Sequence, residues 1–322
     1  MDCQYCQYCQ GRTKKFGRTN DGRQRFRCLT CRKISSEKRE RPLGEMRLPL
    51  DRALLVLQLL CEGSSVRAIE RLTGTEKKTI LRLLKQVGTG CERMLAETVK
   101  GVPVADVECD ELWTFVRCKE ATKARKGIMD LDAGDCYTFV AMERSSKLVL
   151  AFKVGRRNTW DAHDFMESLD AATVGEFQIS TDGWNGYPET ISYNLGARVA
   201  YGMVVKEFRQ GSSEEIRRYS PPRLLRTEKV TVYGEPEEKR MSTSRIERHN
   251  WTIRTHLRRL TRLSNGFSRK RSNLRAAMAL FFAYYNFCKI HRSIRMTPAM
   301  KAGITRKPWE MADLLQAAQQ AA

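Results

Sequence analysis

The spacing of apolar residues changes several times along the chain, and each change predicts a different kind of element. Helical spacing predicts three helices in the N-terminal third, over 50–60, 64–72 and 75–87. Dense apolar runs then predict four strands, over 107–116, 136–142, 147–154 and 177–182. Helical spacing returns between the last two strands, from 158 to 169, and again over 188–195, 243–261 and 274–287. The chain therefore combines several helices with at least one sheet.

The order of the elements beyond residue 100 predicts the fold of that part. Three strands in succession, a helix, and a strand that ends in Asp182 form the order of the ribonuclease H-like fold. In that fold the first and fourth strands lie side by side at the centre of the sheet. Residues 202–240 contain turn-forming residues, Gly211, Pro221 and Pro222 among them, so we expect an irregular insertion there.

Three isolated carboxylates stand out from this pattern. Asp110 lies inside an apolar run, Asp182 ends another, and Glu247 is the only acidic residue between 240 and 275. Ionised groups in or beside a core are costly unless they are paired or bind metal, so the three predict a divalent metal site. Glu111 points to the other side of its strand and is a weaker candidate ligand. An ion pair between Glu247 and Arg254 on one helix is the alternative for Glu247.

Cysteines organise residues 1–41. The spacing of Cys6 and Cys9, and of Cys28 and Cys31, matches the two knuckles of a site with four thiolates and one structural Zn²⁺. The segment has almost no apolar core, so metal binding would supply its folding free energy. Cys3 could replace Cys6 or Cys9, and redox-active or unpaired thiols are the alternative to zinc.

The charge of the chain predicts a polyanionic partner. The 322 residues include 58 Lys and Arg against 37 Asp and Glu, a net charge of +21. Nucleic acid is favoured over membrane because no apolar stretch approaches 18 residues. The odd total of 11 cysteines, several of them in apolar runs, fits a reducing cytosol, and we expect a cytoplasmic, nucleoid-associated protein.

Two segments predict contacts with DNA in the N-terminal third. A basic hairpin between the cysteine knuckles would present Arg25 and Arg27 to phosphates. The three helices beyond it have helix-turn-helix spacing, with Ser64 or Ser65 capping the second helix and Thr75 the third. The start of the third helix would then read a major groove through three exposed cations, Lys77, Lys78 and Arg82. Any compact helical bundle can imitate this spacing.

A third basic segment surrounds Glu247. Positions three and four residues apart along the predicted helix 243–261 place Asn250, Arg254 and Arg258 on the same side as Glu247. We expect this face to hold the DNA strand that reacts.

The most specific sequence features combine into a family resemblance. They are Gln24-Arg25-Phe26-Arg27-Cys28, the helix-turn-helix, Asp110-Glu111-x-Trp113-x-Phe115-Val116, Thr181-Asp182-Gly-Trp-x-x-Tyr187, and Ile246-Glu247-Arg248-x-Asn250 followed by Arg-Arg-Leu-Thr-Arg-Leu and Phe267-Ser268. Together they resemble transposases of the insertion-sequence-one family over nearly the whole chain. This chain reads continuously through the DNA-binding and catalytic parts, whereas family members often make them from overlapping reading frames.

The resemblance implies a function and a division into domains. By position, Asp110, Asp182 and Glu247 correspond to the DDE triad of a DNA transposase. Such an enzyme binds the terminal inverted repeats of a mobile element, then cleaves strands and joins them to target DNA. Two Mg²⁺ or Mn²⁺ ions held by the triad would serve this chemistry, with no covalent enzyme intermediate. We expect a multidomain α+β chain, with a zinc ribbon in 1–41, a helix-turn-helix domain in 42–100 and a ribonuclease H-like α/β catalytic domain with C-terminal helices in 101–322.

Two alternatives share some of these features. A sequence-specific DNA-binding regulator would use the ribbon and the helix-turn-helix alone, and a ribonuclease H-like nuclease would use the metal site without transposition. All three acids of the triad are present, which favours an enzyme. We expect the active form to be a homo-oligomer, at least a dimer when it is bound to double-stranded DNA.

Overall fold

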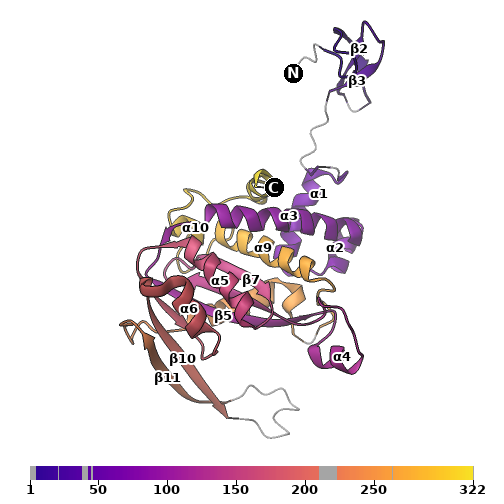
Figure 1. Ribbon diagram of the computed structural model, residues 1–322. Coiled ribbons are helices and arrows are strands. Elements are labelled where there is room, and N and C mark those ends of the chain that lie inside the picture. Colours follow the sequence, from indigo (N-terminus) through magenta and orange to yellow (C-terminus); the bar gives the residue numbers. More distant parts are fainter. Residues whose placement is uncertain are drawn as a thin grey trace. The chain divides into compact units, whose positions relative to one another are not determined.

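The computed structural model describes residues 5–20, 22–37, 43–44, 46–209, 223–262 and 264–321. The chain divides into two compact units, Met1–Leu50 and Asp51–Ala322 (Figure 1). It is a mixed α+β protein in which nearly all of the helices expected in 42–100 belong to the second unit. Cys3, Gly211, Pro221 and Pro222 lie outside the described residues.

The first unit contains a small antiparallel sheet in the order β1-β2-β3, formed by Thr13–Arg18, Gln24–Cys28 and Ile34–Ser36. The hairpin predicted between the cysteine knuckles is present as β1 and β2. Its turn is closed by the amide of Thr19, which donates to the carbonyl of Arg23 over 2.9 Å. Gly22 adopts φ = 82°, a left-handed conformation that favours glycine.

The second unit begins with the three predicted helices, α1 (Leu50–Cys61), α2 (Val66–Thr73) and α3 (Lys77–Thr98). Ser65 caps α2 by accepting from the amide of Ala68 over 3.1 Å, which confirms one of the two serines expected there. The expected cap at Thr75 is wrong. The Glu70 carboxylate accepts instead from the amide of Lys77 over 2.9 Å, so α2 itself satisfies the first free donor of α3.

A six-stranded sheet in the order β11-β10-β9-β5-β6-β7 forms the centre of this unit. Its strands are β5 (Asp106–Val116), β6 (Gly134–Glu143), β7 (Val149–Gly155), β9 (Phe177–Thr181), β10 (Val199–Arg209) and β11 (Arg223–Tyr233). β5, β6 and β7 form the predicted antiparallel meander, whereas β9 runs parallel to both β5 and β10. The runs that carry Asp110 and Asp182 are therefore neighbours at the centre of the sheet.

Helices connect the parallel strands and cover the sheet. α5 (Thr159–Ala172) links β7 to β9, and α6 (Tyr187–Leu195) links β9 to β10 (Figure 1). Beyond the sheet follow α8 (Ser244–His256), the 3-10 turn η2 (Arg258–Leu260), α9 (Arg271–Phe287), α10 (Pro298–Lys301) and α11 (Met311–Gln320). The remaining short elements are β4 (Val102–Pro103), α4 (Glu120–Arg125), β8 (Thr173–Val174) and η1 (Gly196–Arg198). Within the described ranges, no helix is both long and apolar enough to cross a membrane.

The irregular insertion expected over 202–240 is wrong for residues 202–209 and 223–233, which form regular strands. Residues 210–222 of the expected insertion lie outside the described residues. β10 extends the sheet beside β9, and β11 pairs with β10 in antiparallel register from Tyr201↔Tyr233 to Arg209↔Arg223. Many residues of these strands are apolar or β-branched, which favours a pleated ribbon. A turn-forming residue lies at the described end of the second strand. Gly234 adopts φ = 69° directly after β11.

α3 packs closely against α9 and α11, and two glycines permit this approach (Figure 1). A methyl group at Gly88 would lie 2.3 Å from the carbonyl oxygen of Ala276 on α9. One at Gly90 would lie 2.0 Å from the carbonyl oxygen of Ala318 on α11. Backbone atoms cannot move aside as a flexible side chain can, so these positions fix α3 to the C-terminal helices.

Gly88→Ala is therefore expected to destabilise the second unit. An alanine in an open helix would stabilise it by about 1 kcal/mol relative to glycine. Here overpacking against α9 should instead lower the free energy of unfolding by about 2 kcal/mol. Urea unfolding followed by tryptophan fluorescence measures this, because all five tryptophans lie beyond residue 51. The exposed neighbour Thr89→Ala is the control, and a gain in stability for Gly88→Ala would contradict the packing.

Candidate functional site

Carboxylates from two adjacent strands meet at the centre of the sheet. Asp110 lies in the middle of β5, and Asp182 follows the last residue of β9. β5 and β9 are parallel, with Glu108 opposite Ser180, so Asp110 and Asp182 each lie two residues beyond a paired position. Their carboxylate oxygens fall within 4.8 Å of one another and of a Glu111 oxygen. The structure thus brings together the two aspartates that the sequence singled out.

Glu111 is closer to this cluster than its place on β5 suggested. Asp182 lies past the end of its strand, where it is within reach of both Asp110 and Glu111. The Glu111 side chain is held by Arg157, whose Nε donates to Glu111 Oε2 over 3.0 Å. Glu111 was the weaker candidate because side chains alternate between the two faces of a strand, which separates Glu111 from Asp110. That argument does not apply to Asp182, which follows the end of β9 and can approach both side chains.

Glu247 lies at the edge of the cluster, in the first turn of α8. It falls outside the group of oxygens within 4.8 Å, but its charge raises the pKa of Asp110. Thr243 Oγ1 donates to Glu247 Oε1 over 2.6 Å, and Lys206 on β10 forms an ion pair with the same oxygen. The alternative in which Glu247 pairs with Arg254 is therefore wrong, because its cation comes from β10.

A buried acid that the sequence analysis did not single out positions α8. Glu108 is 1% exposed, and its Oε2 accepts from the amides of Arg245 and Ile246 over 2.8 and 3.0 Å. These are free donors at the start of α8, where a negative charge is also favoured by the helix dipole. Glu108 lies two residues before Asp110 on the same face of β5, so it fixes the helix that carries Glu247 above the strand that carries Asp110.

Asn250 and Arg254 also face the strand from α8. Asn250 Nδ2 donates to Asp110 Oδ2 over 2.7 Å. Arg254 donates to the main-chain carbonyls of Trp113 and Leu260 over 3.0 and 3.1 Å, which ties α8 and η2 to β5. The predicted helix 243–261 ends earlier, at His256, so Arg258 lies in η2 and is exposed.

Arg157 is the second residue of the site that the sequence analysis missed. It lies between β7 and α5, and its Nη2 is 3.5 Å from Asp182 Oδ2 in addition to its contact with Glu111. Its guanidinium also lies over the rings of Trp184 and Tyr137, 5.1 and 6.0 Å from their centroids. The side chain is thereby held as a cation beside two carboxylates. Only the basic pair Arg156-Arg157 could have pointed to it in the sequence.

The electrostatics of the cluster favour an added cation. Burial, followed by the charge of Asp182, raises the pKa of Asp110 to about 7. The same two causes raise the pKa of Glu111 to about 7, against the lowering effect of the nearby Tyr187 hydroxyl. Full ionisation of the cluster near neutral pH therefore requires more positive charge than Arg157 and Lys206 supply.

The donor set fits a hard divalent ion. All of the candidate ligands are oxygens, which Mg²⁺ and Mn²⁺ prefer. Asn250 Oδ1 is a buried acceptor that lacks a hydrogen-bond donor in the described part of the chain. Acceptors buried without a partner are costly, and a cation or its bound water would satisfy them.

The four predicted cysteines form a separate cluster in the first unit, and this cluster could hold a metal ion. Cys6 Sγ lies 3.6 Å from Cys31 Sγ, and Cys9 Sγ lies 3.5 Å from Cys28 Sγ. Four thiolates bound to zinc at about 2.3 Å would be about 3.8 Å apart, close to these separations. Amide donors from Cys31 and Thr30 lower the pKa of Cys28 to about 6 and so favour its thiolate.

The other cations predicted to bind DNA lie on two elements. Arg25 and Arg27 flank the half-exposed Phe16 ring on the ribbon, 5.5 and 5.3 Å from its centroid. Lys77, Lys78 and Arg82 are exposed in the first turns of α3.

Among known proteins, the likeness found to this chain is structural and weak. No protein-family model matches the chain, and no curated protein matches it. A solved structure, a cryo-EM structure of a piggyBac transposase synaptic complex with hairpin DNA, superposes with a TM-score of 0.37 and 7% sequence identity. The alignment covers 84% of this chain and 70% of that one. A likeness of this degree does not establish a shared fold or activity.

Proposed function

We propose that the protein is a DNA transposase of the DDE type, with Asp110, Asp182 and Glu247 as its triad. One observation carries this proposal. Two aspartates on adjacent parallel strands converge at the centre of the sheet, and a helix docked on the first strand brings a glutamate to their edge. The sequence context of these three residues and the resemblance to the insertion-sequence-one family point to the same triad.

The strand order supports a ribonuclease H-like catalytic domain. Three antiparallel strands precede a helix and a parallel strand, and the first and fourth of these strands are neighbours in the sheet. This is the arrangement expected when the chain was analysed as sequence. The extension through β10 and β11 adds two strands beyond that minimal set.

The chain's own residues would prepare the carboxylates for metal and for DNA. Asp110, Asp182 and Glu247 would hold Mg²⁺ or Mn²⁺, with Glu111 available as a further oxygen ligand. When bound, a pair of such ions would activate the attacking oxygen and stabilise the leaving oxygen of an in-line displacement. Asn250 orients Asp110 through its amide. Arg157 and Lys206 hold positive charge at the rim, where the phosphate of the reacting strand would lie.

DNA recognition is assigned to the basic elements outside the carboxylate cluster. The ribbon, held by one Zn²⁺ on Cys6, Cys9, Cys28 and Cys31, would place Arg25 and Arg27 on phosphates. The start of α3 would present Lys77, Lys78 and Arg82 to a major groove. The partner is double-stranded DNA, both at the ends of the mobile element and at the target.

The direct test uses the DNA that flanks the gene. Inverted repeats there would define a duplex substrate, which is incubated with the purified protein and Mg²⁺. The expected products are a free 3′-hydroxyl at the repeat end and that end joined to a second duplex. Cleavage without joining would indicate a nuclease. Specific binding without cleavage would indicate a regulator, and either result would overturn the proposal.

Arg254 and Arg258 are expected to behave differently when each is replaced by alanine. Loss of Arg254 removes charged donors from two carbonyls, so the free energy of unfolding should fall by about 1–3 kcal/mol. Arg258→Ala should leave stability unchanged and reduce the log–log salt slope of duplex binding by about 0.9 for one lost phosphate contact. Urea unfolding and fluorescence anisotropy between 50 and about 200 mM salt measure the two effects. Equal salt slopes for wild type and Arg258→Ala would remove Arg258 from the DNA contacts.

A further inference from the structure

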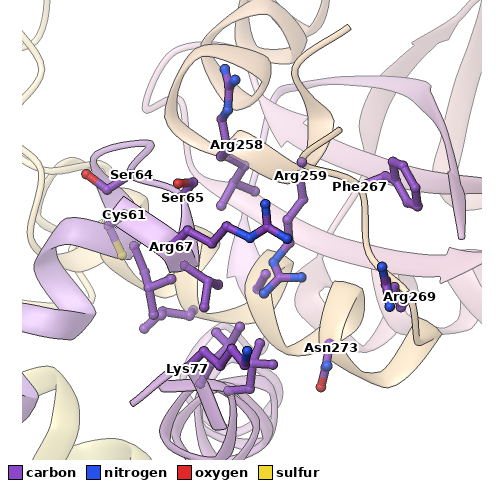
Figure 2. Close-up of a pocket in the computed structure, with 18 of the residues that line it drawn as sticks. Cys61, Ser64, Ser65, Arg67, Lys77, Arg258, Arg259, Phe267, Arg269 and Asn273 are labelled. Atoms are coloured by element: carbon purple, nitrogen blue, oxygen red, sulfur yellow. The ribbon is translucent and has the colours of Figure 1, made fainter. Parts of the chain in front are cut away.

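A large basic cavity lies in the second unit, away from the carboxylate cluster. Its volume is about 780 Å³, and it is enclosed by the segment joining α1 to α2, the start of α3, η2 and the chain leading into α9 (Figure 2). Leu84, Leu257 and Leu280 form part of an apolar floor. Cavities of this size accommodate small organic ligands.

The charged residues that line the cavity are all basic. They are Arg67, Lys77, Arg258, Arg259 and Arg269, and among the residues that the structure describes no Asp or Glu lines the cavity. Within the described ranges none of the five forms an ion pair, although acids are frequent elsewhere in the unit. Cations gathered without a counter-charge repel one another unless an anion joins them. The lining is therefore complementary to an anionic ligand.

Arg259 gives the strongest indication of where the anion lies. Its Nη1 donates to Ser268 Oγ over 3.0 Å, while its buried Nη2 has no hydrogen-bond partner among the residues that the structure describes. Burial also lowers the pKa of Arg259 to about 10, which reflects a charge without compensation. In Figure 2 the guanidinium groups of Arg67 and Arg259 extend toward the same space, whereas Arg258 points away from it. Two planar forks of donors that converge in this way suit the oxygens of a phosphate.

We propose that this cavity binds one nucleotide, with its phosphate between Arg67 and Arg259 and its apolar part on the leucine floor. The proposal rests on the proposed function, because the nucleotide is taken to belong to the reacting DNA. A free nucleoside phosphate has the same chemistry and is the other possible source.

The position of the cavity defines which nucleotide it would hold. Ser268 forms a bridge to Val116, six residues beyond Asp110 on β5. At a rise of about 3.3 Å per residue, the cavity lies about 20 Å from the carboxylate cluster. A duplex whose axis follows β5 advances about 3.4 Å per nucleotide, so it would place the bound nucleotide about six positions from the phosphodiester that reacts.

Arg67→Gln tests the phosphate contact in the full-length protein, with Arg71→Gln as the matched control. Both residues are exposed arginines on α2, but only Arg67 lines the cavity. With a 40-base-pair duplex as probe, Arg67→Gln should reduce the log–log salt slope by about 0.9, and Arg71→Gln should leave it unchanged. Arg269→Gln is a second exposed variant that removes a cation from the lining. Equal slopes for Arg67→Gln, Arg269→Gln and wild type would overturn the proposal.

Neutral linkages locate the contact along the strand. Methylphosphonates are placed singly in a duplex that ends in the inverted repeat flanking the gene. The substitution about six nucleotides from the cleaved bond should weaken wild-type binding and have no further effect on Arg67→Gln. If the methylphosphonate and Arg67→Gln weakened binding additively at every position, the assignment to DNA would be overturned.

Thermal unfolding with dAMP would then test a free nucleotide as the ligand. Stabilisation of the wild type but not of Arg67→Gln would identify a free nucleotide, and stabilisation of neither would end the proposal.

The test of the cavity and the test of transposase activity can fail independently of each other. If the protein bound duplex DNA through Arg67 but did not cleave it, the cavity would stand as a nucleic-acid site and the transposase would fall. If the protein cleaved and joined DNA while Arg67→Gln behaved as Arg71→Gln does, the transposase would stand and the cavity assignment would fall.

Discussion

Asp110→Asn, Asp182→Asn and Glu247→Gln should each lower the rate of strand cleavage and joining by at least about a thousandfold. Metal ions at such a site stabilise the charge of the transition state by several kcal/mol, and about 1.4 kcal/mol corresponds to a tenfold change in rate. Each change removes one carboxylate charge and keeps the size of the side chain, so packing of the sheet is preserved. Binding to duplex DNA should persist in all three variants, because the proposed recognition residues lie on other elements.

Two further variants make this experiment discriminating. Glu111→Gln should reduce the rate less than the triad variants do, because Glu111 lies outside the proposed triad and is already paired with Arg157. Asp164→Asn removes an acid that pairs with Lys153 on the surface, and should leave the rate unchanged. Cleavage at near the wild-type rate by any triad variant would remove that residue from the site. A loss in Glu111→Gln equal to that of Glu247→Gln would place Glu111 in the essential set.

Local patterns were sufficient to find four strands of the central sheet and the two aspartates. Asp110 and Asp182 could be identified because each interrupts or ends an apolar run, and apolar runs of that length are a local signal of buried strands. Their convergence also followed from the order of elements, since parallel pairing of β5 and β9 brings the two positions together. The hairpin between the cysteine knuckles was also predicted from a local signal, the turn residues between two basic segments.

Residues that act through tertiary contacts could not be found in this way. Glu108 is important because α8, more than 130 positions later in the chain, places two free amides on it. Arg157 reaches the cluster from between β7 and α5, and in the sequence only its basic neighbour Arg156 distinguishes it. The end of α8 at His256 is set by Arg254, which draws η2 against β5 through the carbonyls of Trp113 and Leu260. Helical spacing continues through that point in the sequence, so periodicity alone overestimated the helix.

Turn-forming residues misled the sequence analysis over 202–240 for a related reason. Glycine and proline were taken to characterise the whole segment, whereas the strands β10 and β11 occupy its residues 202–209 and 223–233. Lys206, which forms an ion pair with Glu247, belongs to β10. Because β10 was not predicted as a strand, Lys206 was not predicted to lie at the site. The contribution of β10 to the carboxylate site could therefore be assigned only from the structure.

The second large effect is expected for Cys28→Ser, which should abolish the folding of the first unit. Apart from its cysteines, the described part of that unit buries few side chains, Phe26 among them, so packing alone cannot hold its three short strands. Structural zinc supplies about 10–16 kcal/mol in comparable small domains. The purified wild type should carry about one equivalent of zinc and the variant almost none. Limited proteolysis should then cut within residues 1–50.

Cys118→Ser provides the matched control, because Cys118 is a thiol of the second unit outside the cluster. It should retain zinc and resist proteolysis as the wild type does. Tryptophan fluorescence should show the same unfolding transition in both variants, since every tryptophan lies in the second unit and that unit has its own core. Cys28→Ser protein that kept a full equivalent of zinc would exclude the four-thiolate site. Loss of zinc with an intact, protease-resistant first unit would instead show that side-chain packing holds the ribbon.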